Sequence, residues 1–266
     1  MAPTQQERGA RFAALHEGEP FVIPNPWDAG SARVLEALGF PALTTTSSGF
    51  AFTLGRLDGS TSLEEVEAHV ASLVAAVEVP VAVDLENGYG PRPEDAAQAV
   101  RRAAAAGAVG GSIEDWDRRG FLYERAQAAE RVAAAAEAAH GLGFPFVLTG
   151  RAENHLRGVP DLDDTIAHLQ AYEAAGADCL YAPGLTSVEE IRAVCSALSK
   201  PVNVLARPGL SLAAIVDAGA QRVSVGGGLT WVAVRAMADA ALAIRAGDLS
   251  PLAARVPLAE WLRREA

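Results

Sequence analysis

Acidic side chains stand at the ends of apolar segments in this sequence. Asp84 and Glu86 follow the apolar residues 81–83, Glu114 ends a second apolar segment, and Arg151 ends a third. Because residues two apart on a strand point to the same face, Asp84 and Glu86 are predicted to lie side by side. Clustered carboxylates are costly to bury without a cation, and oxygen ligands without His or Cys favour Mg²⁺ or Mn²⁺. The pattern predicts a divalent-metal site, with a network of ion pairs to Arg151 as the alternative.

A second group of residues suits the binding of an anion. The guanidinium of Arg151 can bind a carboxylate or phosphate through two hydrogen bonds. Ser47, Ser48 and Gly49 directly follow another apolar segment, and glycine lets backbone N–H groups approach a ligand closely. These groups and Asn203, on a later segment, are predicted to bind substrate, although an ordinary polar turn would also explain the serines. A metal, an arginine and such a turn together describe a site for a small dianionic oxo acid.

Residues with an ionisable O–H group could move protons at this site. Decarboxylation of an oxaloacetate-type acid needs little beyond a stabilised enolate, because CO₂ leaves without a base. Retro-aldol cleavage of a 2-hydroxy acid also needs a base for the hydroxyl and an acid for the enolate carbon. The candidates are Tyr89, Tyr123, Tyr181 and Glu153. We predict Arg151, Tyr89 and Glu153 as the catalytic residues, with packing as the alternative role of Tyr89.

The elements that must position these residues repeat along the chain. Alanine-rich helical segments end in glycine, and each is followed by a short apolar strand. Eight strands are predicted, at residues 21–25, 42–47, 81–86, 110–115, 146–151, 179–183, 202–206 and 222–227. Eight strand–helix units in about 250 residues predict a (β/α)8 TIM barrel, in which chemistry lies at the C-terminal ends of the strands. A doubly wound open sheet is less favoured, because the first strand leads into no G-x-G-x-x-G loop.

Helix ends and the chain's outer segments complete this prediction. Left-handed C-caps are expected at Gly39, Gly107, Gly143, Gly176 and Gly219, and capping boxes at Ser62 with Glu65 and Ser187 with Glu190. Residues 1–266 are predicted to form one domain, with a barrel core at about 20–247. The tail 251–266 is predicted to form an extra amphipathic helix, which packs either on its own barrel or on another subunit.

Composition excludes several classes of function. Half of the 266 residues are hydrophobic, the formal net charge is −11, and the sequence pI is about 4.9. Such acidity argues against nucleic acids and anionic membranes as partners. Cys179 and Cys195 lack metal-binding spacing and are predicted to be free thiols of a cytoplasmic protein. No signal-peptide or membrane-spanning apolar run is expected.

The motifs resemble those of the isocitrate lyase/phosphoenolpyruvate mutase superfamily over residues 20–245. The carriers are "NPWDAGSARVLEALGFPAL", "TTSSGFAFTLGRLDG", "VAVDLENGYG", "GGSIED", "TGRAEN" and "DCLYAPGL". The resemblance implies a (β/α)8 barrel that binds Mg²⁺ and a 2-oxo acid or its enolate. It implies Asp84 as the direct metal ligand, and Glu86, Glu114 and Asp58 as holders of the metal's water molecules. It also implies Ser48, Gly49, Phe50 and Arg151 as the binding site of the substrate's anionic end, and a homo-oligomer, a dimer or tetramer, that swaps its last helix.

The chain departs from the superfamily in the loop that selects the reaction. The cleaving lyases carry a K-[KR]-C-G-H loop, and the C–P enzymes carry Lys and Asn; residues 116–127 contain neither pattern, although Arg118 and Arg119 could supply charge. The sequence does not decide whether this loop closes over the site. We predict a Mg²⁺-dependent lyase that acts on a small 2-oxo or 2-hydroxy carboxylic acid. A phosphoenolpyruvate mutase or phosphonopyruvate hydrolase is the second choice, and a metabolite-binding barrel without turnover is the third.

Overall fold

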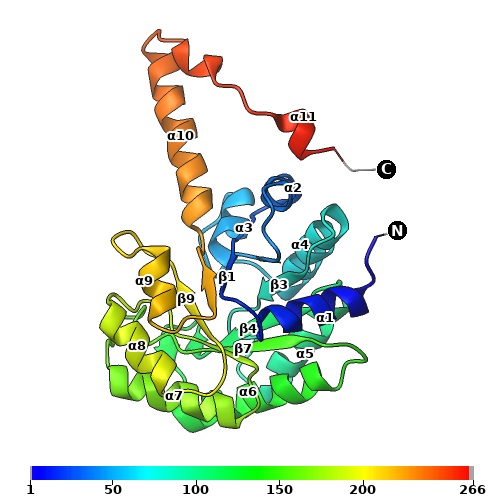
Figure 1. Cartoon of the computed structure of the whole chain (residues 1–266), viewed down its shortest axis with the longest axis vertical. Helices are drawn as coiled ribbons and strands as arrows, with labels where there is room; N and C mark the ends of the chain where they lie inside the picture. Colours follow the sequence, from blue (N-terminus) through cyan, green and yellow to red (C-terminus); the bar gives the residue numbers. More distant parts are fainter. Residues whose placement is uncertain (1, 264–266) are drawn as a thin grey trace.

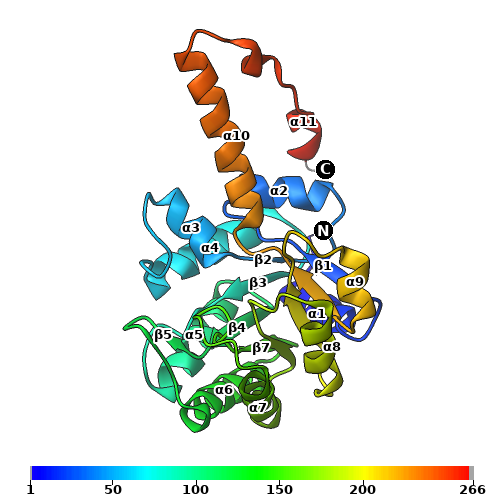
Figure 2. The same ribbon diagram turned by 90° about the vertical axis from the view of Figure 1, so that its left-hand side faces the viewer.

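The computed structural model describes residues 2–263 and contains a barrel of eight parallel strands surrounded by helices (Figures 1 and 2). The strands are β1 (Phe21–Ile23), β2 (Leu43–Thr44), β3 (Val81–Asp84), β4 (Gly110–Glu114), β7 (Val147–Arg151), β8 (Cys179–Tyr181), β9 (Val202–Leu205) and β10 (Arg222–Ser224). They follow the order β1-β10-β9-β8-β7-β4-β3-β2. The predicted (β/α)8 architecture is confirmed, and all eight strands fall in the predicted segments.

The barrel closes between its first two strands through loop contacts. The amide of Thr44 donates to the carbonyl of Pro24 over 3.1 Å, and the Asn25 side chain donates to the carbonyl of Thr45 over 2.9 Å. Proline cannot donate to a strand ladder, so the P-N-P segment limits regular pairing at this seam. The result is a nearly closed barrel rather than an open sheet.

The helices lie outside the strands. They are α1 (Gln5–Leu15), α2 (Ala29–Ala37), α3 (Ser47–Thr53), α4 (Leu63–Ala76), α5 (Pro93–Ala105), α6 (Arg125–His140), α7 (Leu162–Ala174), α8 (Val188–Ser196), α9 (Leu212–Asp217), α10 (Gly228–Arg245) and α11 (Leu258–Trp261). Both predicted capping boxes are confirmed, at α4 and α8. Of the five predicted glycine caps, four have positive φ, whereas the cap at Gly143 was wrong because α6 ends at His140 and is capped by Gly141.

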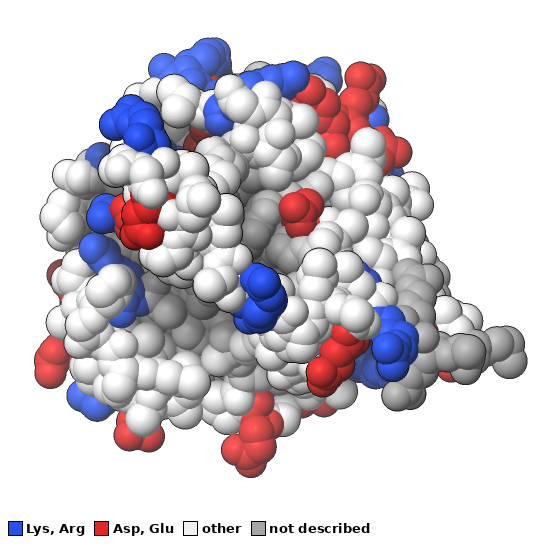
Figure 3. Space-filling view, turned by 90° about the horizontal axis from the view of Figure 1, so that it is seen from above, with Lys and Arg blue, Asp and Glu red and all other residues white. Residues whose placement is uncertain are grey.

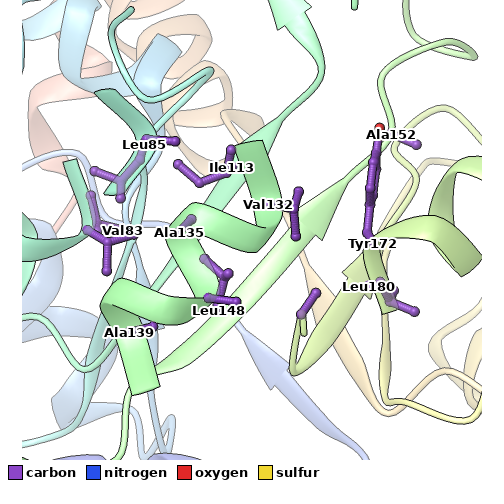
Figure 4. Packing of buried hydrophobic residues seen from close by; sticks show 14 of the residues in the cluster. Val83, Leu85, Ile113, Val132, Ala135, Ala139, Leu148, Ala152, Tyr172 and Leu180 are labelled. Atoms are coloured by element: carbon purple, nitrogen blue, oxygen red, sulfur yellow. The ribbon is translucent and has the colours of Figure 1, made fainter. Parts of the chain in front are cut away.

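Alanine-rich helix faces give the barrel its outer core. Figure 4 shows Val83, Leu85, Ile113 and Leu148 of the strand segments beside Val132, Ala135 and Ala139 of α6. Helix α6 also packs on α5, whose inner face is largely alanine and buried. Small side chains let these helices approach the sheet closely, which fixes the strand ends that carry the acidic residues.

Helix α1, which the sequence analysis did not predict, closes the N-terminal end of the barrel. Its Phe12 is fully buried and enters the space beside Gly110, where an added Cβ would lie 2.5 Å from the Phe12 ring. His16 donates from Nδ1 to the carbonyl of Phe12 over 2.8 Å and accepts from Arg222 Nη1 over 3.0 Å. Arg222 also donates to Asn203 and Thr149, so it spans the interior of the barrel.

This contact predicts a pH-dependent stability. Burial, together with the charge of Arg222, lowers the pKa of His16 to about 3. The unfolded chain therefore binds a proton that the folded chain excludes, and stability should fall as pH decreases from about 6.5 towards about 3. The limiting contribution is about 1.4 kcal/mol per pH unit. His16→Gln, whose amide can replace both hydrogen bonds, should flatten this part of a urea-unfolding profile, and an unchanged acid slope would contradict the assignment.

Two local differences from the predicted strands shape the site. The predicted strand 42–47 ends early, because Thr46 caps helix α3 through its hydroxyl and Ser47 is already helical. The predicted strand 81–86 ends at Asp84, because Glu86 has φ +47. Strands β5 (Trp116–Asp117) and β6 (Phe121–Leu122) form an antiparallel hairpin within the loop 116–127.

Helix α10 leaves the barrel after its first turn (Figures 1 and 2). The predicted helical tail was wrong in extent: the described part contains a 3₁₀ turn at Ser250–Ala253 and the short α11, which returns towards α2, while residues 264–266 lie outside the described residues. The helix that is free of its own barrel is thus α10 rather than the tail. Seen from that end, charged side chains are scattered over a face made mostly of other residues (Figure 3). In the part of the chain that is described, no helix has the length and apolarity to cross a membrane.

Candidate active site

The ends of β3, β4 and β7 bring three predicted site residues together. Glu114 and Arg151 are direct neighbours in the pairing of β4 with β7, and Asp84 lies on the adjoining strand β3. Arg151 Nη1 lies 3.4 Å from Glu114 Oε2 and 3.6 Å from Asp84 Oδ2. All three side chains are at most 14% exposed. These distances bring two of the predicted acids and the predicted arginine close together at the C-terminal ends of the strands.

Glu86 reaches the mouth through a turn, not through strand alternation. Its left-handed backbone is followed by two more positive φ values, at Gly88 and Tyr89. Such a conformation costs free energy for residues other than glycine, and it persists here because Arg118 binds both carboxylate oxygens, at 2.8 and 2.9 Å. Burial raises the pKa of Glu86 to about 7; Arg118 opposes this shift, whereas Asp84 and Asp58 add to it.

The electrostatics of the mouth suit a cation. Burial raises the pKa of Glu114 well above its usual value, with Arg151 opposing and the neighbouring acids adding to the shift. Carboxylate oxygens are the donors that Mg²⁺ and Mn²⁺ prefer. Within residues 2–263, no group of three or more His, Cys, Asp or Glu side chains is already arranged as a metal site. Arg118 pairs with Glu86, and Arg151 contacts both Asp84 and Glu114. The carboxylates at this site suit a hard cation, which would take the place of Arg118 and Arg151 beside them.

Two cavities lie at this end of the barrel. The outer cavity, of about 200 Å³, is lined by Ser47, Asp58, Gly59, Glu86, Glu114, Trp116, Arg118, Arg151 and Arg157. The inner cavity, of about 60 Å³, extends into the barrel and shares Arg151 with the outer one. Its polar lining includes Asn25, Thr44, Thr45, Asp84, Ser112, Thr149, Tyr181, Asn203, Arg222 and Ser224. Predicted residues Asp58 and Asn203 therefore face these two spaces.

The predicted anion-binding turn is the first turn of α3. Ser47 lines the outer cavity. The amide of Gly49 donates to the hydroxyl of Thr46, and the amide of Phe50 donates to the carbonyl of Thr46. Since those two N–H groups are already used within the helix, a ligand would meet Ser47 first. The Phe50 ring is buried in the core and stacks on His69 at 4.0 Å.

Tyr89 and Glu153 are not part of the lining of either cavity. Tyr89 donates to Glu86 Oε1 over 3.3 Å, and the Arg118 guanidinium lies 4.5 Å from the centre of its ring. Glu153 is fully buried and accepts from Arg151 Nε over 2.6 Å. Its other oxygen lies 2.7 Å from Arg157 Nη2. These contacts favour a role for Glu153 in orienting the two arginines.

Several residues of the cavities were missed or left unassigned by the sequence analysis. Arg157 and Trp116 form one wall, with the guanidinium 4.3 Å from the ring centroid. Their meeting depends on how the hairpin folds, which no local pattern reveals. Thr149 and Arg222 could have been found, because they lie two residues before Arg151 and Ser224, which line the inner cavity, and residues two apart on a strand share a face.

The chain is similar to one known protein family and to several individual proteins. A family model described as phosphoenolpyruvate phosphomutase matches residues 12–245. The uncharacterized protein Rv1998c of Mycobacterium tuberculosis (strain ATCC 25618 / H37Rv) is 32% identical over 250 residues, covering 94% of this chain and 93% of that protein. An oxaloacetate decarboxylase of Rhodopseudomonas palustris (strain BisB5) is 31% identical over 231 residues, covering 83% of this chain and 78% of the decarboxylase.

A solved structure is similar over nearly the whole chain. It comes from Burkholderia cenocepacia J2315, and its assignment as a lyase/mutase is provisional. The two chains share 48% of their residues, with a TM-score of 0.95, over 98% of this chain and 97% of that one. The match therefore extends through α10 and beyond the core of the barrel.

Proposed function

This chain belongs to the phosphoenolpyruvate phosphomutase family, and from that premise we propose that it is a Mg²⁺-dependent lyase of small 2-oxo carboxylic acids. The resemblance to the isocitrate lyase/phosphoenolpyruvate mutase superfamily is thereby confirmed. The observation that carries the proposal is the meeting of Asp84, Glu114 and Arg151 beside two polar cavities at the C-terminal ends of the strands. A 2-oxo acid offers a carboxylate for the arginine and two oxygens for a metal.

Asp84 would hold the metal directly, with Glu86, Glu114 and Asp58 holding its water molecules; Mn²⁺ could replace Mg²⁺ there. When bound, the ion would withdraw electrons from the 2-oxo oxygen and stabilise an enolate by several kcal/mol. Arg151 would bind and orient the substrate carboxylate, and Glu153 would hold Arg151 in place. The hairpin β5–β6, docked through Arg118, would keep bulk water from the enolate.

Carbon–carbon cleavage fits the hairpin better than carbon–phosphorus chemistry. Residues 116–127 carry no Lys or Asn, and Arg118 is held by Glu86 and by the carbonyl of Thr61. Of these reactions, decarboxylation requires the fewest catalytic groups from this hairpin, because CO₂ departs without a base. The similarity to an oxaloacetate decarboxylase supports the same choice. We therefore propose decarboxylation of an oxaloacetate-type acid as the reaction to test first.

A substrate panel tests this proposal. Oxaloacetate, 2-methylisocitrate, isocitrate, malate analogues and phosphonopyruvate are incubated with the chain, with and without Mg²⁺, and the release of CO₂, pyruvate, glyoxylate and phosphate is measured. Mg²⁺-dependent CO₂ and pyruvate from oxaloacetate is the expected result. Phosphate release or rearrangement of phosphonopyruvate alone would favour the C–P reaction. Ligand-dependent stabilisation without any turnover would favour a metabolite-binding barrel.

We also propose that α10 packs on a second copy of the chain in a homodimer or homotetramer. Of its residues, all of which are described, Thr230 is the buried one, whereas Val232 and Met237 are 67% and 63% exposed. Exposed apolar residues along a projecting helix indicate an interface. Cys179 and Cys195, both free, support a cytoplasmic location for this assembly.

Charge placed on α10 should dissociate the assembly. Val232→Glu with Met237→Glu is expected to yield monomers, because two carboxylates would be buried in an apolar contact. Light scattering coupled to size-exclusion chromatography measures the mass. Arg235→Glu on the same helix changes the net charge by the same amount at an exposed position that pairs with Asp239, and this control should stay assembled. A wild-type monomer would overturn the proposal.

A further inference from the structure

An enolate becomes a 2-oxo acid only when its carbon receives a proton, and the site described so far names no donor. Of the four candidates that the sequence offered for proton transfer, Tyr89, Tyr123 and Glu153 line neither cavity. Among the described residues that line either cavity, none is His, Cys or Lys. The arginines stay protonated, and the carboxylates are engaged by arginines or reserved for the cation. Apart from the carboxyl groups, the phenol of Tyr181 is the remaining ionisable O–H group in these linings.

Tyr181 is placed next to the groups that handle the substrate. It ends β8, where it pairs with Arg151 on β7 and with Asn203 on β9. The Arg151 guanidinium lies 5.1 Å from the centre of its ring. The side chain is 8% exposed and lines the inner cavity together with Asp84. A substrate held by Arg151 and by a cation at Asp84 would therefore lie against this phenol.

We propose that Tyr181 is the catalytic acid that protonates the enolate carbon; this assignment rests on the proposed enolate chemistry but not on which bond is broken. In decarboxylation, the bond between the leaving carboxylate and the carbon next to the 2-oxo group breaks, and CO₂ departs. The electron pair of that bond stays with the remaining 2-oxo acid and forms the enolate. The enolate carbon then takes the proton from the Tyr181 O–H, the 2-oxo group re-forms, and the phenolate regains a proton from water when product leaves.

The surroundings of Tyr181 suit both of its states. Burial raises the pKa of the phenol to about 12, so it carries its proton at neutral pH; Arg151 opposes the shift by stabilising the phenolate, and a hydrogen bond from Ser224 acts in the same direction. The phenol therefore keeps its proton at neutral pH and lies beside the positive charge of Arg151, which stabilises the phenolate formed after proton transfer. This arrangement is that of a general acid.

Proton exchange tests the assignment without reference to C–C or C–P chemistry. The chain is incubated in D₂O with Mg²⁺ and 2-oxobutanoate, whose C3 carries two hydrogens that an enzyme can distinguish. By reversal of the last step, the wild type should exchange one of them selectively, at a rate that rises with pH between about 7 and about 10 as the small phenolate fraction grows. Proton NMR after enzymatic reduction to 2-hydroxybutanoate reports the stereochemistry.

Tyr181→Phe keeps the ring over which Arg151 lies and should abolish selective exchange while leaving the melting temperature and Mg²⁺ binding in place. Tyr123→Phe, which removes a phenol outside both cavities, is the matched control and should retain the selectivity. Selective exchange by Tyr181→Phe, or its absence from the wild type, would overturn the assignment. Exchange that depends on Tyr181, together with no reaction of the substrate panel, would instead refute the proposed decarboxylation.

Discussion

Replacing Asp84 with Asn is expected to lower kcat/KM for the 2-oxo acid by about a thousandfold. The amide keeps the shape of the side chain but loses the charge that would bind the cation directly. Enolate stabilisation by a metal ion is worth several kcal/mol, and about 4 kcal/mol corresponds to about three orders of magnitude in rate. The Mg²⁺ concentration that gives half-maximal rate should rise in parallel.

Asp58→Asn provides the control for this prediction. Asp58 lines the outer cavity, whereas Asp84 lines the inner one. The side chain of Asp58 is exposed and would act on the cation only through water. Its loss should reduce kcat/KM by about tenfold, the effect of about 1.4 kcal/mol. Steady-state rates over a Mg²⁺ series separate the two variants. Equal losses for Asp84→Asn and Asp58→Asn would show that Asp84 has no special place among the acids.

Arg151→Met should abolish turnover and also destabilise the folded chain by about 3 kcal/mol in the absence of metal. Arg151 is the shared partner of Glu153, Glu114 and Asp84, and its loss leaves buried carboxylates without their main counter-charge. Arg157 remains beside Glu153, which is why the lower end of the range for broken buried pairs is expected. Urea unfolding, followed by circular dichroism, measures the loss.

The pH dependence of the Arg151→Met defect identifies its cause. Burial already raises the pKa of Glu114, and without the opposing arginine the pKa should rise further. A carboxyl group that binds its proton more tightly when folded gains stability as pH decreases, so the defect should shrink between about pH 7 and about pH 5. The double variant with Glu153→Gln should lose less stability than the sum of the single losses. A defect that is constant with pH would point to lost packing instead.

Much of the fold could be predicted from the chain because the repeated unit is local. Each strand is a short apolar run after an alanine-rich segment, and the cap signals at Ser62 and Ser187 act within a few residues. The acids that end strands β3 and β4 could be found for the same reason. Helix α1 was not predicted, because its place in the fold depends on a contact between residues distant in sequence, the insertion of Phe12 beside Gly110.

The site was less accessible to sequence reasoning where the backbone leaves regular geometry. Alternation put Glu86 on the face of Asp84, yet a left-handed turn and Arg118, 32 residues later, decide its position. The proposed proton donor shows the same limit. Both tyrosines were candidates from the sequence. Tyr89 was preferred because it follows the acidic pair in the chain, whereas the fold favours Tyr181, which lies beside Arg151 of the adjoining strand. The sequence indicates which side chains end strands, but not which of the tyrosines lies beside Arg151.

Helix α1 covers the N-terminal end of the barrel, where Phe12 and His16 pack with Arg222. The inner cavity shares Arg151 with the outer cavity beside the hairpin, so under the proposed function substrate and products would pass on that side of the barrel. Two products of one cleavage would then depart in turn and not through separate exits. Under the proposed chemistry, a slow separation of Arg118 from Glu86 would limit the turnover rate even where bond cleavage is fast.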